Sequence, residues 1–307
     1  DVPIPSIVAR RLVVEPALSE LVPFIDWTFF FSAWGLKGRF PAILDHPQYG
    51  PAARDLHAHA TALLDTIVRD RSLQARGVYG IWPAAAMDDD VVVFDEESRR
   101  HEHLRFPMLR QQEVVEEARA HLSLADFVAP VGSGVRDHVG AFAVTAGIGA
   151  DDLAAGYVRS HDDYHSIMVK ALADRLAEAF AEYLHARVRR EWGYDTSASW
   201  SIEDLAAEKY RGIRPAFGYP ACPDHSEKVK LFQLLDAEAI GMELTGNCAM
   251  TPAASVSGLC FASPHAKYFN LGRIGRDQVA SYAARKGVAV TEIERWLAPH
   301  LGYETRE

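Results

Sequence analysis

Apolar residues recur every three to four positions across residues 151–187, the longest periodic segment of the chain. This spacing predicts one amphipathic helix whose apolar stripe packs against a sheet. The stripe consists of Leu153, Tyr157, Tyr164, Met168, Leu172, Leu176, Phe180 and Leu184. Asp174 and Glu178 lie one turn apart on a different face of this helix. Taken alone, such an acidic pair indicates a solvated helix surface.

Further segments predict a mixture of helices and strands. A second apolar stripe predicts a helix over residues 51–75. Residues 77–83 and 90–94 read as a β-hairpin, and residues 123–130 and 139–145 as two more strands. Because these elements do not alternate as regular βαβ units, we expect an α+β fold: a single domain with an antiparallel-rich mixed sheet and packed helices. It is not a Rossmann fold, since no Gly-x-Gly-x-x-Gly follows a predicted strand.

The chain divides near its start. Residues 1–15 contain Pro3 and Pro5 followed by two arginines, and they predict an N-terminal arm or linker. Residues 16–307 show no repeat, low-complexity tract or clear linker, and they predict the domain itself. No apolar run reaches the roughly 18 residues that a membrane span requires.

Composition narrows the class of protein. The 307 residues are 49% hydrophobic and 24% charged, which is typical of a globular domain, and the net charge of −10 argues against a nucleic-acid partner. Three cysteines form neither a metal-type spacing nor an even disulfide set, which suits a reducing cytoplasm. His57 and His59 stand two positions apart on a predicted helix and point away from each other, so we expect no metal site. We expect a cytoplasmic monomer.

Residues 211–228 form an irregular segment that carries candidate ligand-binding side chains. They hold three prolines, two glycines and five charged residues, so neither a helix nor a strand runs through them. Long irregular segments in compact domains are usually functional or disordered, and the aromatic residues here argue against disorder. Arg214 offers a planar fork that matches a carboxylate. The alternative is a proline-stiffened structural loop with Arg214 in a surface ion pair.

Asp26 stands within an aromatic run that extends from Phe24 to Trp34. A carboxylate in such surroundings needs a partner. Asp26 is therefore either a buried structural hydrogen bonder or a group that receives a cationic ligand.

The sequence of the irregular segment resembles the signature of a known family. It reads Arg214-Pro-Ala-x-Gly218-Tyr219-Pro-Ala-Cys-Pro-Asp-His-x-x-Lys228. That family is the C-terminal activation domain of cobalamin-dependent methionine synthase, which binds S-adenosylmethionine. The resemblance continues in order along nearly the whole chain. Its other blocks include Phe24-Ile-Asp26-Trp27, Ala75-Arg-Gly77-Val-Tyr-Gly80, Leu124-Ala-Asp126-Phe-Val-Ala-Pro130, His161-Asp-Asp163-Tyr164, Ser255-Val-Ser-Gly258 and Glu294-Arg-Trp296-Leu-Ala-Pro299.

The resemblance implies six residues that contact S-adenosylmethionine, namely Asp26, Arg214, Gly218, Tyr219, Tyr268 and Phe269. Arg214 would take the ligand's carboxylate, and Asp26 would pair with one of its positive centres. The other four would bring backbone or aromatic groups against it. The family can carry Tyr-Tyr-Phe where this chain has Lys267-Tyr-Phe, so the role of that first tyrosine has no counterpart here.

The resemblance also implies a reactivation role in methionine synthesis from homocysteine. S-Adenosylmethionine would donate its methyl group to cob(I)alamin, formed from inactive cob(II)alamin with one electron from a flavodoxin-like or diflavin reductase. Cobalamin would be bound by a separate module, toward which Asp174 and Glu178 would face. Because cobalt attacks the methyl group, no catalytic side chain is required, and the protein supplies proximity and orientation.

Other functions fit parts of the pattern. No Asp-x-His-x-x-Gly motif, which donates a histidine to cobalt, occurs in these 307 residues, so we expect the activation module alone, either excised or separately encoded. One alternative is a non-catalytic, regulatory S-adenosylmethionine-binding module for a separate corrinoid protein. A conventional methyltransferase would ordinarily show a glycine-rich loop after its first strand, and none is evident here.

Overall fold

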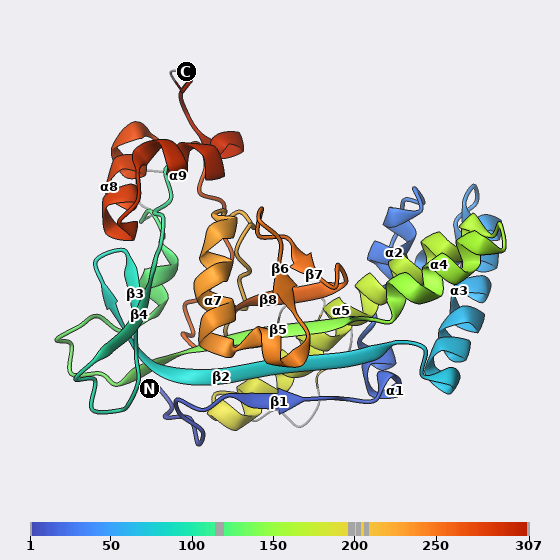
Figure 1. Ribbon diagram of the computed structural model, residues 1–307, viewed down its shortest axis with the longest axis horizontal. Coiled ribbons are helices and arrows are strands. Elements are labelled where there is room, and N and C mark those ends of the chain that lie inside the picture. The colour runs from blue at the N-terminus through green and yellow to red at the C-terminus, as the bar shows by residue number, and fades with distance from the viewer. Residues whose placement is uncertain (1, 114–119, 196–199, 201–203, 206–208, 306–307) are drawn as a thin grey trace.

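A computed structural model describes residues 2–113, 120–195, 200, 204–205 and 209–305 (Figure 1). Its centre is a sheet with helices packed against both faces and gathered at both ends of the long strands. None of the helices in this described part combines the length and apolar character that a membrane span requires.

Six strands form the main sheet in the order β4-β3-β2-β5-β8, with β1 also paired to β2. They are β1 (Leu12–Val14), β2 (Gln74–Met87), β3 (Asp90–Phe94), β4 (Glu102–Pro107), β5 (Asp137–Ile148) and β8 (Ser255–Cys260). A separate ribbon pairs β6 (Glu243–Leu244) with β7 (Met250–Thr251). The α+β prediction is confirmed. The expected mixed sheet has only antiparallel ladders between its described strands.

The described α-helices are α1 (Leu18–Leu21), α2 (Trp27–Ala33), α3 (Gly50–Asp70), α4 (Ala150–Arg159), α5 (Asp163–Trp192), α7 (Lys228–Leu235), α8 (Arg276–Lys286) and α9 (Val290–Trp296). Short 3-10 helices connect them, namely η1 (Val22–Phe24), η2 (Ala42–Asp45), η3 (Leu124–Phe127), η4 (His225–Glu227), η5 (Ala237–Ile240) and η6 (Ala298–His300). Helix α5 is the longest, and it runs along one face of the sheet (Figure 1).

Two local predictions are wrong because side chains cap the backbone. The predicted single helix over residues 151–187 is two helices, since the Asp162 carboxylate accepts a hydrogen bond from the His165 amide at 3.0 Å and starts α5 anew. The predicted strand at 123–130 contains η3 instead. There the Ser123 hydroxyl accepts a hydrogen bond from the Ala125 amide, and the Asp126 carboxylate accepts one from the Ser123 amide.

The predicted N-terminal arm is joined to the domain. Its last residues form β1, which pairs with β2 in the register Leu12↔Tyr79. The Ala9 amide also donates to the Ile81 carbonyl at 2.7 Å. The boundary between an arm and a domain near residue 15 stays a prediction.

Strand β2 is buried on both of its faces, which explains its nearly continuous apolar sequence. Tyr79 and Ile81 enter the core between the sheet and helices α3 and α5. Val78 and Trp82 point the other way, into the core that α7 covers. Alternate residues of one strand therefore serve two cores, as the period of two in a β-strand requires. A third apolar cluster joins α8 and α9 to the neighbouring segments that carry Leu109, Ile274 and Leu301.

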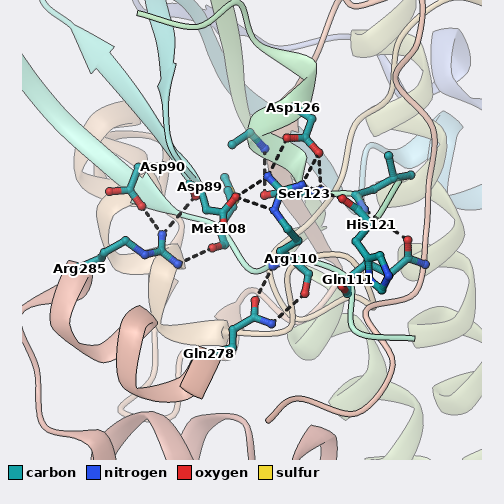
Figure 2. A network of polar contacts seen from close by, with 12 residues as sticks. Asp89, Asp90, Met108, Arg110, Gln111, His121, Ser123, Asp126, Gln278 and Arg285 are labelled. Atoms are coloured by element: carbon teal, nitrogen blue, oxygen red, sulfur yellow. Dashed lines mark hydrogen bonds and ion pairs between the residues drawn. The ribbon is translucent and has the colours of Figure 1, made fainter. Parts of the chain in front are cut away.

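A polar network fixes α8 to the end of the sheet near β3 and β4 (Figure 2). The Arg110 guanidinium forms a two-pronged ion pair with Asp126, with N–O distances of 2.8 and 2.9 Å. Gln278 of α8 holds the backbone of Arg110 at both its N–H and its C=O. Arg285, also on α8, pairs with the buried Asp90. Helix α8 is therefore held by charge-assisted contacts as well as by its apolar face.

A second, more deeply buried network joins α8 to the irregular segment. The Lys286 ammonium lies 2.5 Å from Asp224 and 2.8 Å from Glu227, and both carboxylates are almost fully buried. The Tyr282 hydroxyl donates to Asp224 at 2.9 Å. Burial alone would raise the pKa of Asp224, but the Lys286 charge and the hydrogen bonds from Lys286 and Ser226 together outweigh burial and lower that pKa.

We expect Lys286→Met to lower the free energy of unfolding by about 3–5 kcal/mol at pH 7, because it leaves the buried Asp224 carboxylate without its cation, whereas Glu227 keeps Lys230 at 2.9 Å. The loss should shrink as the pH falls toward 5, since the unpaired Asp224 carboxyl then takes up a proton. Urea unfolding at both pH values measures this. Lys37→Met, at an exposed position, is the matched control. A loss that is equally large at both pH values would contradict the ion-pair explanation.

Candidate functional site

A cavity of about 800 Å³ opens between α5, the start of α2 and the irregular segment. Aromatic and charged side chains make up much of its wall. The lining residues are Phe24, Asp26, Phe29, Arg175, Glu178, Ala179, Glu182, Leu205, Tyr210, Arg214, Pro215, Ala216, Tyr219, Pro220, Ala221, Val256, Tyr268, Phe269 and Asn270. Five of the six predicted ligand-binding residues meet in this wall, although they come from three distant parts of the sequence.

Arg214 is anchored at the base of the irregular segment by an ion pair with α5. Its Nη1 lies 2.8 Å from the Glu182 carboxylate and donates to the Tyr210 hydroxyl at 2.8 Å. Burial alone would lower the pKa of Arg214, but Glu182, together with Tyr210, Tyr268 and Glu178, outweighs burial and raises the pKa. Both side-chain contacts within the described residues use Nη1. The Nη2 edge of the fork therefore has no side-chain partner among them.

Asp26 does not pair with Arg214, whose acidic partner is Glu182. Its Oδ1 accepts from the Thr28 amide at 2.8 Å and caps the N-terminus of α2. Asp26 is half-buried in the cavity wall. One oxygen of Asp26 is therefore structural, and the other has no hydrogen bond or ion pair within the described part of the chain. The interpretation of Asp26 as a group that receives a cationic ligand stays a prediction.

Gly218 is the one predicted ligand-binding residue that the structure leaves out of the wall. Its φ of +101° is unfavourable for residues with a side chain, and a Cβ there would lie 2.2 Å from the His225 ring. Its amide donates to the Cys222 carbonyl at 2.8 Å. The glycine thus closes a tight loop over His225, and its neighbour Tyr219 reaches the cavity with a largely exposed ring.

Tyr268 and Phe269 approach Arg214 from another irregular segment, which lies between β8 and α8. The Tyr268 hydroxyl accepts from the Arg214 amide at 3.1 Å. Phe269 packs edge-on against Phe127, with ring centroids 6.3 Å apart. The carbonyl of Asn270, which follows Phe269, accepts a hydrogen bond from the Gln111 side chain at 3.0 Å. These contacts fix the two aromatic rings at the cavity edge.

Asp174 and Glu178, one turn apart on α5, have different surroundings. Asp174 is exposed and lies outside the wall, whereas Glu178 is half-buried and forms part of it. Burial, together with the Glu178 charge, raises the pKa of Tyr219. The Tyr219 hydroxyl therefore stays neutral and is able to donate a hydrogen bond.

Sequence reasoning missed several wall residues. Glu182 lies one turn beyond Glu178, so extending that helical face by four residues would have found it. Arg175 places its guanidinium over the Phe29 ring, 5.8 Å from the centroid. No signal in the sequence pairs these two residues, because α2 and α5 meet only in the folded chain.

Comparison with known proteins agrees with this geometry. A family model described as "Vitamin B12 dependent methionine synthase, activation domain" matches residues 17–287. A solved structure described as the MetH reactivation domain bound to AdoHcy is 48% identical, with a TM-score of 0.95. That match covers 98% of this chain and 93% of the solved one. The resemblance read from the sequence is confirmed, and the chain belongs to the family of vitamin B12-dependent methionine synthase activation domains.

Proposed function

We propose that this chain binds S-adenosylmethionine in the cavity beside Arg214 and presents its methyl group to a cobalamin held by a separate module. The observation that carries this proposal is the meeting of Arg214, acidic groups and aromatic rings in one wall. Methionine synthase is a methyltransferase, and membership in its family implies a cobalamin module in the same enzyme.

The cavity fits the ligand in size and chemistry. Small-molecule sites usually measure about 300–1,000 Å³, and this cavity falls within that range at about 800 Å³. The ligand's carboxylate suits the Nη2 edge of Arg214, and its positive centres suit Asp26 and Glu178. Tyr219, Tyr268 and Phe269 provide rings for the adenosyl part. The solved relative with AdoHcy supports the same assignment.

The protein's own contribution is to bind and orient the ligand. Arg214 fixes one end of it, while the aromatic rings at the cavity edge limit its rotation. Cobalamin supplies the nucleophile once it has received one electron. No side chain of this chain has to give up or accept a proton, so we assign no catalytic residue and attribute the rate to proximity.

We further propose that the exposed Asp174 faces the cobalamin module, next to the cavity wall that contains Glu178. A flavodoxin-like or diflavin reductase would supply the electron, and the domain would act in the cytoplasm as a monomer. Gly218 would support the site by shaping the loop rather than by touching the ligand.

Two measurements test the proposal. Isothermal titration should detect one S-adenosylmethionine site per chain. When the chain is mixed with the cobalamin module and a reductant, the methyl group should pass to cobalamin. Binding without transfer would favour a regulatory module, and absence of binding would refute the proposal.

We expect Arg214→Lys to weaken S-adenosylmethionine binding more than about tenfold, because a bidentate charge-assisted contact is worth about 1.5–3 kcal/mol. Lysine keeps the positive charge beside Glu182, whereas alanine would leave that buried carboxylate unpaired and complicate the result. Titration measures the affinity, and thermal melting without ligand is the control. Unchanged affinity in the folded variant would remove Arg214 from the site.

We expect Asp26→Asn to weaken S-adenosylmethionine binding but to have little effect on an analogue that lacks the matched positive centre. Asparagine caps helices about as well as aspartate, so the ligand-free protein should melt nearly normally. Titrations with the two ligands and a melting curve without ligand measure these effects. A large fall in melting temperature with unaltered selectivity would show that the carboxylate is purely structural.

We expect Asp174→Ala to leave S-adenosylmethionine binding by the isolated domain unchanged and to weaken its docking on the cobalamin module. The reason is position, since Asp174 is exposed and outside the cavity wall. Ligand titration and a binding assay between the two modules separate the effects. Reduced ligand affinity in the isolated domain would show that Asp174 belongs to the ligand site and not to the docking surface.

A further inference from the structure

The His225 ring lies directly against the turn that carries Tyr219. A Cβ on Gly218 would lie 2.2 Å from the His225 Cε1 atom and 2.6 Å from its Nδ1, so the ring leaves no room for a side chain there. Two backbone hydrogen bonds close the turn, one from the Gly218 amide to the Cys222 carbonyl at 2.8 Å and one from the Cys222 amide to the Tyr219 carbonyl at 2.9 Å. Because the ring and the backbone are in contact, the position of the turn depends on the position of His225.

Tyr219 takes its place in the cavity wall from this turn. Its side chain is largely exposed and lines the cavity. Within the described part of the chain, its hydroxyl makes no hydrogen bond and its ring packs on no other aromatic ring. The backbone of the turn therefore sets where the Tyr219 ring lies, and its contact with a ligand is only as well defined as the support beneath Gly218.

A buried cation holds the His225 ring in this position. Lys228 is almost fully buried, and its ammonium lies 3.0 Å from His225 Nδ1 and 3.2 Å from the Cys248 carbonyl. It has no carboxylate at ion-pair distance among the residues that the structure describes. An ammonium only donates hydrogen bonds, so Nδ1 accepts this one and the proton of the neutral ring lies on Nε2. The imidazole is thus one of the two groups that stabilise the buried ammonium.

The contact between Lys228 and His225 accommodates one positive charge. A second proton, on Nδ1, would place two cations 3.0 Å apart with no acceptor between them. Burial, together with the charges of Lys228 and His300, lowers the pKa of His225 below its ordinary value, while Asp224 acts in the opposite direction. Asp224 is already paired with Lys286, so it offers little compensation for a second charge. At neutral pH the ammonium therefore carries the charge and the imidazole is uncharged.

We propose that His225 is a positioning residue for S-adenosylmethionine binding, whose uncharged ring, held by Lys228, keeps the turn with Tyr219 in the cavity wall. This inference rests on the proposed function, since it takes the cavity as the ligand site. A second proton drives the His225 ring away from Lys228 and out from under Gly218. The supporting position binds that proton less readily than a free histidine does, so it is disfavoured as the pH falls below about 6.5. The affinity for S-adenosylmethionine falls with it.

The test is isothermal titration of the whole chain with S-adenosylmethionine between about pH 7 and pH 5, where the ligand's ammonium keeps its proton. The wild-type affinity should fall at least about fivefold across this range. His225→Gln keeps an acceptor for Lys228 but does not titrate, so it should match the wild type at pH 7 and lose less than about twofold at pH 5. In Lys228→Met the fall should begin at a higher pH, because the charge that opposes protonation of His225 is gone. His101→Gln, at an exposed position outside the cavity wall, should keep the wild-type profile.

Proton magnetic resonance of the histidine Cε1–H signals gives a second readout that does not depend on the ligand. The signal missing from His225→Gln belongs to His225, and it should titrate at a lower pH than the signal missing from His101→Gln. An ordinary titration of His225 would overturn the inference.

The remaining outcomes separate this inference from the proposed function. If the wild type and His225→Gln lose affinity equally on acidification, another group titrates and the inference is wrong. If His225→Gln binds weakly at every pH, the ring is a structural support without a requirement for charge, which also overturns it. If the wild-type chain binds no S-adenosylmethionine at pH 7, the proposed function itself fails and this inference fails with it.

Discussion

The ion pair between Arg214 and Glu182 is the interaction on which the site depends. It joins the irregular segment to α5, the longest helix of the described chain. A guanidinium buried to this degree is costly unless a carboxylate compensates it. The Tyr210 and Tyr268 hydroxyls lie against the same arginine, so two further segments take their position from it. The orientation of the guanidinium at the cavity wall is thereby fixed by the protein's own contacts.

Further charged and polar side chains of α5 lie behind this ion pair. Arg189 is fully buried behind Glu182, at 3.8 Å, and is paired with Asp195 at 2.9 Å. Burial, together with the positive charges of Arg214 and Arg189, lowers the pKa of His185 well below its ordinary value. His185 is therefore neutral, and its Nδ1 accepts from Arg189 at 2.9 Å. Behind Glu182, α5 therefore carries a buried arginine held between Asp195 and a neutral imidazole.

The irregular segment is held at its far end as well. Asp224, near that end, lies in the network with Lys286 and Tyr282 of α8. Gly218 lies between the two anchors, over His225. A loop fixed at both ends, and closed by the backbone hydrogen bond from Gly218 to Cys222, holds Tyr219 in place without a long helix or strand. Such preorganisation suits a domain whose task is to orient a methyl group, since positioning costs less when the site is already formed.

The sequence by itself determined the fold class, the family and five of the residues that line the cavity. Periodicity is local, so it found the helix that became α5 and the β2–β3 hairpin. Local caps at Asp162 and Ser123 still redirected the chain where apolar patterning predicted continuity. The prolines and glycines of the irregular segment indicated that no long helix or strand runs through it, which made it a candidate functional segment.

Only the tertiary structure decided which charges meet. The partner of Arg214 is 32 positions away on α5, and no pattern of spacing links the two residues. The same packing separated Asp174 from Glu178, although they are one turn apart, because the cavity wall passes between them. It also placed Gly218 outside the cavity wall, where this glycine closes the loop over His225. A side chain's type limits what it can bind, but its partner is set by long-range packing, which the local sequence does not encode.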